Sequence, residues 1–230
     1  MILSAHQPAY LPWIGYFAKI AASDAFVLHD QSRIGRANML HRNRIGTADG
    51  PLLLTIPLDH AGLRAELPLN EIRLLDDGWR RKHWKAIQMA YRRAPYFEQH
   101  AEFLAGYYGR TYETLDEVCL PFIEYSMREL KLDCPLYRIS QLELPAYDRQ
   151  SIIPVLCGAF GADRFVAGPH ALDYLDQVPI RDAGITVDVF DYHHPVYPQI
   201  RRGFTSHLSV LDLLMNCGPA SAGLVKGGTA

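Results

Sequence analysis

The first 28 residues of the chain constrain its fold most, because strand and helix patterns alternate there over a very short length. Residues 2–5 form an apolar run that a His-Gln-Pro turn ends, which predicts a buried strand. A helical pattern follows over residues 13–22, and Pro12 suits its start because the missing N–H costs nothing there. Residues 25–28 predict a second buried strand. Such a strand–helix–strand unit predicts two neighbouring parallel strands with a right-handed crossover, and so an α/β domain.

The remainder of the chain continues this alternation, with a block of helices in the middle. Long helical patterns cover residues 78–93, 96–108 and 111–130. The other predicted elements are strands over residues 52–58, 137–140, 164–167 and 185–192, and helices over residues 151–161, 171–177 and 208–216. We therefore predict a mainly parallel, Rossmann-like sheet with a helical insertion at about residues 78–130. The sequence favours a single α/β domain over residues 1–218, followed by a flexible tail over residues 219–230.

The composition excludes several functional classes. The 23 basic and 25 acidic side chains leave a formal net charge of −2, which argues against a nucleic-acid-binding protein, so we expect no nucleic-acid partner. No apolar run approaches the ~20 residues that span a bilayer, and no signal-peptide pattern opens the chain, so we expect a cytoplasmic protein without an integral membrane segment. The four cysteines form no CxxC pair, which excludes a zinc knuckle, and we expect neither a metal nor another cofactor.

The densest group of chemistry-bearing residues follows the first predicted strand, at the edge where α/β sheets bind ligands. His6 has a near-neutral reference pKa and is a candidate general base, and Gln7 beside it can orient a substrate by hydrogen bonds. Tyr10, Trp13 and Tyr16 follow, and their rings can stack on a sugar or a base. The alternative is a rigid turn in which Trp13, Tyr16 and Phe17 only pack.

A basic cluster follows the second predicted strand. Four arginines, two asparagines and a histidine fall within residues 33–44. Arg42 and Arg44 are candidates for bidentate binding of a diphosphate or carboxylate, and Asn43 is a candidate for orienting the substrate. Asp30 lies just before the cluster, and we place it with His6 and Gln7 in the candidate catalytic set. The alternative is a solvated basic loop.

A third group, residues 192–202, follows the last predicted strand. His193 and His194 are adjacent, so on an extended segment one faces the site and the other faces solvent. We take His193 as a substrate-binding candidate, together with Tyr197 and Gln199, which are two residues apart and share a face. Ser209 is predicted to cap the last helix.

These segments resemble the WbqC-like protein family. The matching motifs are His6 to Phe17 with Lys19 and Asp24, Asn43-Arg44-Ile45, Leu54-Thr55-Ile56-Pro57, the Trp79 and His83 pair, and His193 to Gln199 with Phe204, Leu208-Ser209 and Asp212. The resemblance runs over most of the chain, from residue 1 to about residue 218. It implies a role in the biosynthesis of bacterial surface polysaccharide (O-antigen), for which a glycine-transferase or related sugar-modifying activity has been suggested in the family.

Three functional hypotheses follow. The first is a cytosolic transferase that acts on a sugar or nucleotide-sugar, with an amino-acyl (glycine-like) group as one candidate for the group transferred. The second is a non-catalytic module that binds a glycan or a partner enzyme. The third is a nucleotidyltransferase-like fold without the phosphate chemistry, because Trp13 and Tyr16 replace the imidazoles of a His-x-Gly-His motif. The first hypothesis predicts that His6, Asn43, Arg44 and Gln199 line one pocket. The sequence leaves the oligomeric state open.

Overall fold

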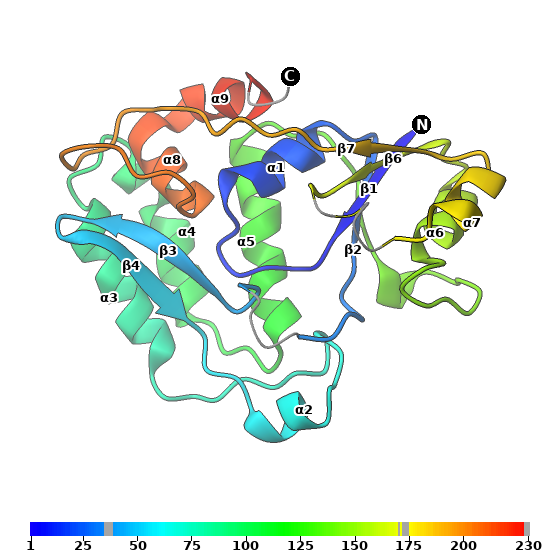
Figure 1. The fold of residues 1–230 in the computed structure, drawn as a ribbon. Helices are drawn as coiled ribbons and strands as arrows, with labels where there is room; N and C mark the ends of the chain where they lie inside the picture. The colour runs from blue at the N-terminus through cyan, green and yellow to red at the C-terminus, as the bar shows by residue number, and fades with distance from the viewer. Residues whose placement is uncertain (35–38, 170, 172–174, 228–230) are drawn as a thin grey trace.

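A five-stranded parallel sheet lies at the centre of the protein, in the strand order β5-β2-β1-β6-β7 (Figure 1). The computed structural model describes residues 1–34, 39–169, 171 and 175–227. The strands are β1 (Ile2–His6), β2 (Ala25–Leu28), β5 (Leu136–Arg138), β6 (Arg164–Ala167) and β7 (Thr186–Val189). Every neighbouring pair in this sheet is parallel. The prediction of a mainly parallel, Rossmann-like α/β fold is therefore confirmed.

The opening strand–helix–strand unit forms as the sequence predicts. Helix α1 (Ile14–Ala21) connects β1 to β2, which pair in parallel from Leu3 opposite Ala25 to His6 opposite Leu28. Asp24 fixes this register, because its backbone N–H donates to Ile2 O at 2.8 Å and its carboxylate accepts from Ile2 N–H at 2.7 Å. The unit places the end of β1, at His6, beside the end of β2.

Helices cover both faces of the sheet, as Figure 1 shows. One hydrophobic cluster includes Phe26 and Leu28, and a second includes Ala25 and Val27, because successive side chains of β2 point to opposite faces. Residues of α1, α3 (Trp79–Tyr91), α4 (Phe97–Gly109), α5 (Leu115–Glu129), α8 (Val210–Cys217) and α9 (Ser221–Gly227) belong to the first cluster. Residues of α6 (Ile152–Phe160) and α7 (Gln177–Asp182) belong to the second. The three helices expected in the middle of the chain are thus present.

A β-hairpin stands apart from the main sheet, and the sequence did not predict it. Strands β3 (Arg42–Thr47) and β4 (Gly50–Thr55) pair antiparallel, and a short helix, α2 (His60–Arg64), follows. The strand expected over residues 52–58 begins earlier, at Gly50, and pairs with β3 instead of joining the main sheet. The end of the basic cluster forms strand β3 instead of a loop. Within this strand Ile45 and Gly46 are buried, whereas Arg44 stays exposed. Residues 35–38 of the cluster lie outside the described part of the chain.

The end of the chain differs from the expected flexible tail. A 3-10 turn at Gly218–Ala220 leads into α9, whose Val225 is fully buried and whose residues contact α1. The Ser221 hydroxyl donates to Leu213 O at 3.3 Å. The small side chains of this segment gave no amphipathic signal in the sequence. Residues 228–230, and residues 172–174 of the helix expected over residues 171–177, lie outside the described part.

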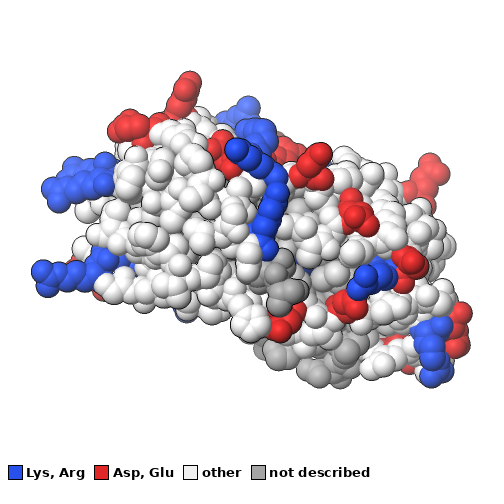
Figure 2. Space-filling model, turned by 90° about the horizontal axis from the view of Figure 1, so that it is seen from above, with Lys and Arg blue, Asp and Glu red and all other residues white. Residues whose placement is uncertain are grey.

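The segment that links β7 to α8 crosses the upper surface of the molecule in Figure 1. Seen from that side, a broad area carries few charged side chains (Figure 2). The segment also exposes apolar side chains, of which Val196 at 76% is the most exposed, followed by Ile200 and Phe204. Within the described part of the chain, no helix is long and apolar enough to cross a bilayer.

Candidate active site

The order of the strands identifies one edge of the sheet as the expected site. From β1 the chain continues outward through β2 and β5, and it then returns to place β6 on the other side of β1. In open α/β sheets, ligands bind at the carboxyl ends of the strands where the order reverses in this way. Here that point lies between β1, which ends at His6, and β6, which ends at Ala167.

The imidazole of His6 is held in a defined tautomer. Its Nδ1 lies 3.0 Å from the carbonyl oxygen of Gln7, so Nδ1 carries the proton and Nε2 is left as an acceptor. The edge of the ring packs against Tyr16, with ring centroids 4.9 Å apart. Burial, and secondarily the charge of Lys19, lower the pKa of His6 to about 4. The imidazole is therefore neutral at pH 7, and no described residue donates to its Nε2.

Beside His6 lies a buried cation that the sequence did not single out for chemistry. Lys19 is only 6% exposed, and its Nζ donates to Ala5 O at 2.9 Å. Burial lowers the pKa of its ammonium to about 8, so the group is mainly charged at pH 7. Within the described part of the chain no carboxylate forms an ion pair with Lys19, and Ala5 O is the one acceptor bound to it. An ammonium has three donors, so two remain for another group. A buried charge of this kind is costly unless a counter-ion neutralises it.

The three aromatic rings proposed for stacking lie in different environments. Tyr10 is fully buried, and its hydroxyl is 2.8 Å from His83 Nδ1 and 2.6 Å from the Tyr108 hydroxyl. Tyr16 is also buried, and its hydroxyl donates to Gln7 O at 3.2 Å. Neither Tyr10 nor Tyr16 presents a free ring face. Of the three rings, only Trp13 is partly exposed.

Trp13 stands at the start of α1, among residues of the C-terminal segment. Its indole stacks on His207 with centroids 5.3 Å apart, and it meets the edge of Tyr192 at 5.0 Å. Gly15 leaves the space that this indole occupies, since a Cβ at residue 15 would lie 2.3 Å from the ring. His207 is exposed and has a positive φ of 57°, which is a strained conformation for a histidine.

Asp30 does not face a ligand. It is fully buried, and its carboxylate accepts from Arg138 Nε at 2.9 Å, from Ser140 N–H at 3.0 Å and from the Ser140 hydroxyl. These contacts fasten the loop after β2 to the end of β5. The oxygen atoms of Asp30 are thus used to hold two segments together, and the structure offers no support for its place in the catalytic set.

The basic cluster contributes structural contacts and one exposed arginine. Asn43 donates to Leu11 O at 2.6 Å and accepts from Arg44 N–H at 2.8 Å, so its amide secures the loop between β1 and α1. Arg44 O accepts from Ser209 N–H at 2.9 Å, while its guanidinium lies on the exposed side of β3. Arg42 is half-buried, two residues before Arg44 on the same strand.

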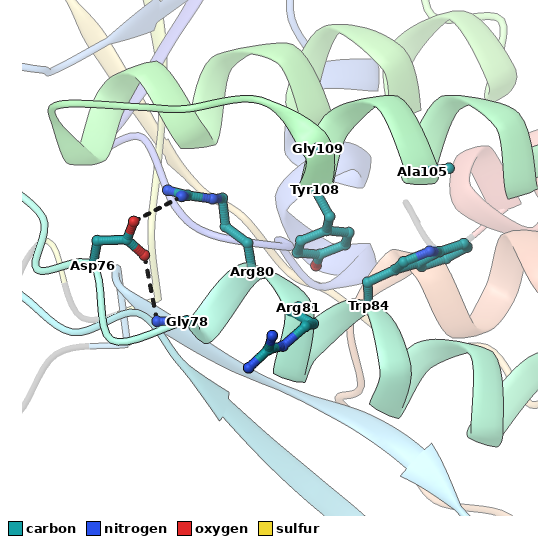
Figure 3. A pocket seen from close by; sticks show the side chains of 8 residues that line it. All are labelled: Asp76, Gly78, Arg80, Arg81, Trp84, Ala105, Tyr108 and Gly109. Carbon is teal, nitrogen blue, oxygen red and sulfur yellow. Dashed lines mark hydrogen bonds and ion pairs between the residues drawn. The ribbon is translucent and has the colours of Figure 1, made fainter.

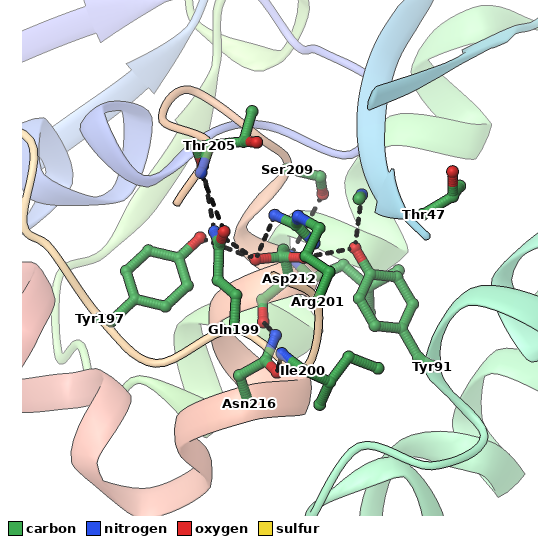
Figure 4. A network of polar contacts seen from close by, with 12 residues as sticks. Thr47, Tyr91, Tyr197, Gln199, Ile200, Arg201, Thr205, Ser209, Asp212 and Asn216 are labelled. Carbon is green, nitrogen blue, oxygen red and sulfur yellow. Dashed lines mark hydrogen bonds and ion pairs between the residues drawn. The ribbon is translucent and has the colours of Figure 1, made fainter. Parts of the chain in front are cut away.

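Tyr197 and Gln199 converge on a buried carboxylate, that of Asp212 at the start of α8 (Figure 4). The Tyr197 hydroxyl and Gln199 Nε2 donate to Asp212 Oδ2 at 3.0 and 2.9 Å. Arg201 Nη1 and the Tyr91 hydroxyl donate to Asp212 Oδ1 at 2.8 and 2.7 Å. We call these five residues the Asp212 network. Asp212 is fully buried, so the network is a structural core in which Tyr197 and Gln199 are already occupied.

The two adjacent histidines do face opposite ways, but the inward one is His194. Its Nδ1 donates to Pro195 O at 2.9 Å, and its Nε2 accepts from His207 N–H at 3.0 Å. The His193 side chain, chosen as a substrate-binding candidate, is 75% exposed and lies 3.9 Å from Asp191. Ser209 caps α8 as expected, because its hydroxyl accepts from Leu211 N–H.

The three segments that were expected to converge do meet. The side chains of His6, Asn43, Arg44 and Gln199, however, do not form the expected pocket. Trp13 forms a β-bridge with Ser209, Asn43 holds Leu11, and Arg44 O bonds to Ser209. Arg44 itself is exposed, however, and Gln199 is bound to Asp212, so the structure does not support a shared pocket with His6. Within the described residues, no group of three His, Cys, Asp or Glu side chains is arranged to hold a metal ion.

Sequence reasoning overlooked Lys19, His207 and Asp212 as central residues. Lys19 carried a readable signal, since it lies three residues after Tyr16 on an otherwise apolar helix and so shares its buried face. Asp212 belonged to the motifs of the resemblance but had no predicted role, and His207 carried no signal, because the importance of both comes from partners that are distant in the sequence.

Comparison with known proteins agrees with this assembly of segments. The family model of the WbqC-like protein family matches residues 7–223. The chain is also 31% identical over 219 residues to a Mycobacterium tuberculosis protein named "Uncharacterized protein Rv1507c", covering 92% of each chain. No solved structure matches significantly. The chain is therefore a member of the WbqC-like protein family.

Proposed function

We propose that this protein is a cytoplasmic transferase of bacterial surface-polysaccharide (O-antigen) biosynthesis, which acts on a sugar or nucleotide-sugar at the edge between β1 and β6. The observation that carries this proposal is the pairing of His6 with Lys19. A neutral imidazole with a free acceptor atom lies beside a buried ammonium that no described carboxylate neutralises. The first group suits a proton acceptor and the second suits a phosphate.

The two residues have complementary roles in the proposed reaction. An acceptor hydroxyl or amine attacks the carbon that is bonded to a phosphate oxygen of the donor. The new bond forms at that carbon, the carbon–oxygen bond to phosphate breaks, and the phosphate keeps the electron pair beside Lys19. The proton of the acceptor passes to His6 Nε2. The group transferred is the sugar, or an amino-acyl (glycine-like) group where the donor is an acyl phosphate.

The low pKa of His6 in the protein without substrate is consistent with this role, because binding of the donor changes that pKa. A phosphate bound beside Lys19 favours the imidazolium form and raises the pKa of His6, so the base strengthens when substrate is present. Trp13 and His207 supply a ring surface at the start of α1 on which a sugar can stack. We also propose that residues 1–218 form a single domain.

The test compares binding with turnover across a panel of nucleoside-diphosphate sugars, using calorimetry and chromatographic detection of the released nucleoside diphosphate. We expect His6→Gln to keep the affinity of the donor and to lower turnover by ~10²–10⁴-fold. Lys19→Met should weaken donor binding. The matched control is His193→Gln, which changes an exposed histidine and should alter neither.

The other outcomes separate the remaining hypotheses. Binding by the wild-type protein without any turnover would make it a glycan-binding module. Release of pyrophosphate from a nucleoside triphosphate would indicate nucleotidyl transfer, which we do not propose because Trp13 and Tyr16 replace the imidazoles that such chemistry uses. Binding that is unaffected by Lys19→Met would contradict the proposed site.

A further inference from the structure

A cleft of about 520 Å³ opens between the start of α3 and the end of α4, on the helical insertion (Figure 3). It is separate from the proposed active site, since none of the residues that line it belongs to the parallel sheet or to α1. Its volume falls in the range of small-molecule sites. The side chains that define it are Asp76, Arg80, Arg81, Trp84, Ala105 and Tyr108.

The cleft has a net positive charge. Arg80 Nη2 pairs with Asp76 Oδ2 at 3.0 Å, and the Arg80 side chain is only 18% exposed. Arg81 is exposed and forms no ion pair within the described part of the chain. Two guanidinium groups and one carboxylate therefore line the cleft, and the second guanidinium is free to bind an anion in a bidentate manner.

The start of α3 adds to this positive potential. Its first turn runs Trp79-Arg80-Arg81-Lys82 and contains no acidic residue, and Gly78 before it provides no side-chain cap. The N-terminal end of a helix favours anions and disfavours cations. Asp76 and Asp77 already pair with Arg80 and Lys82, so Arg81 is the basic side chain of this turn that remains to bind an anion in the cleft.

Two aromatic rings form the wall of the cleft. The half-buried Trp84 lies nearly parallel to Tyr108, at 16° with centroids 6.2 Å apart, and to Phe97, at 10° and 6.2 Å. The Tyr108 hydroxyl is fixed by the Tyr10 hydroxyl at 2.6 Å. The rings are therefore held rigidly before any ligand arrives, which lowers the entropic cost of stacking a planar group on them.

We propose that this cleft binds a nucleotide, with the base stacked beside Trp84 and the phosphate on Arg81. A flat apolar wall and a free guanidinium within one small cleft match the two parts of that ligand. Arg80, held by Asp76, adds a second positive charge near the phosphate. This site goes beyond the proposed transferase activity and does not depend on His6 or Lys19.

The experiment measures binding of AMP, adenosine and ribose 5-phosphate to the full chain by calorimetry. We expect AMP to bind at least tenfold more tightly than either fragment. Arg81→Ala should weaken AMP at least tenfold. Ala105→Glu should abolish binding, because residue 105 is an exposed helical position that lines the cleft, and Ala105→Gln separates the charge of that change from its bulk. Arg93→Ala, at an exposed arginine outside the cleft, is the control and should leave AMP binding unchanged.

Three results would overturn the proposal. The first is the absence of AMP binding at 1 mM, which we set as roughly the weakest affinity of interest. The second is equal binding of AMP and ribose 5-phosphate. The third is AMP binding that survives both Arg81→Ala and Ala105→Glu. His6→Gln should bind AMP as the wild type does. Loss of transferase activity with intact AMP binding would therefore count against the active site alone.

Discussion

The guanidinium of Arg201 lies directly over Gly46, so that a Cβ at residue 46 would stand 1.6 Å from Arg201 Nη1. The same Nη1 donates to Asp212 Oδ1 at 2.8 Å. Gly46 N–H donates to the Tyr91 hydroxyl, which in turn donates to Asp212 Oδ1. The missing side chain at residue 46 thus lets β3 approach the buried ion pair, and the Asp212 network joins β3, α3 and α8.

Gly46→Ala should displace the Arg201 guanidinium from Asp212. We expect a loss of ~1–3 kcal/mol in the free energy of unfolding, as for other overpacked core positions. Chemical denaturation of Gly46→Ala, Arg201→Gln and the double variant measures the coupling. Because both changes break the same ion pair, the double variant should lose less than the sum of the two. Additive losses would show that Gly46 and Arg201 act independently.

Asp212→Asn should be among the most destabilising polar substitutions in the chain. It leaves the buried guanidinium of Arg201 without a counter-charge, and breaking a buried pair in this way costs ~3–5 kcal/mol. The matched control is Glu113→Gln, which removes an ion pair with Arg73 in which both side chains are at least 70% exposed. That change should cost ~1 kcal/mol or less. Similar midpoints in urea for both variants would contradict the role given to Asp212.

Stability should fall as the pH is lowered from 6.5 towards 4. Burial lowers the pKa of His6 and of His83 to about 4 in the folded chain, whereas an unfolded histidine titrates near 6.5. Between these values the unfolded chain binds protons that the folded chain does not, so each histidine contributes a slope of up to ~1.4 kcal/mol per pH unit. Urea unfolding at pH 7, 6 and 5 checks this, and His83→Gln should reduce the slope. An unchanged slope would be evidence against it.

The last helix should contribute measurably to stability. Val225→Ala removes buried methyl groups of α9 and should cost ~1–2 kcal/mol. Gly223→Ala, at an exposed position of the same helix with no neighbour within 4 Å of the added Cβ, should be neutral or stabilising by up to ~1 kcal/mol. Thermal scans of the two variants compare packing with helix propensity. A loss in the second variant but not the first would indicate that α9 does not pack as described.

Sequence patterns over short stretches of the chain predicted those parts of the fold that depend on neighbouring residues. The β1–α1–β2 unit follows from apolar runs, a proline and a turn within 28 residues, and the three long helices follow from their periodicity. Strand β3 escaped prediction because the polar Asn43 lies on the same face as Ile45 and so conceals the alternation of apolar and polar residues. Helix α9 escaped because its small side chains show no clear apolar face.

The sequence predicted only the part of the candidate site that lies at the end of β1. His6 follows from the apolar run that it ends, and the strand order then places it at the ligand-binding edge. The Asp212 network could not be predicted, since Tyr91 and Asp212 are 121 residues apart. Asp30, Tyr10 and Gln199 carry chemistry-bearing groups, but partners that only folding brings near them use those groups for structure.

The central position of β1 has a consequence for how the protein is made. β1 is synthesised before the other strands of the sheet, yet one of its two neighbours, β6, begins at Arg164. The helix that follows it, α1, is covered by α9, which begins at Ser221. The apolar segments β1 and α1 therefore stay without all of their final partners until the chain has been synthesised beyond Ser221. A nascent chain of this kind is expected to depend on chaperones that shield β1 and α1 during translation, and termination just before Ser221 should be as harmful as termination before Arg164.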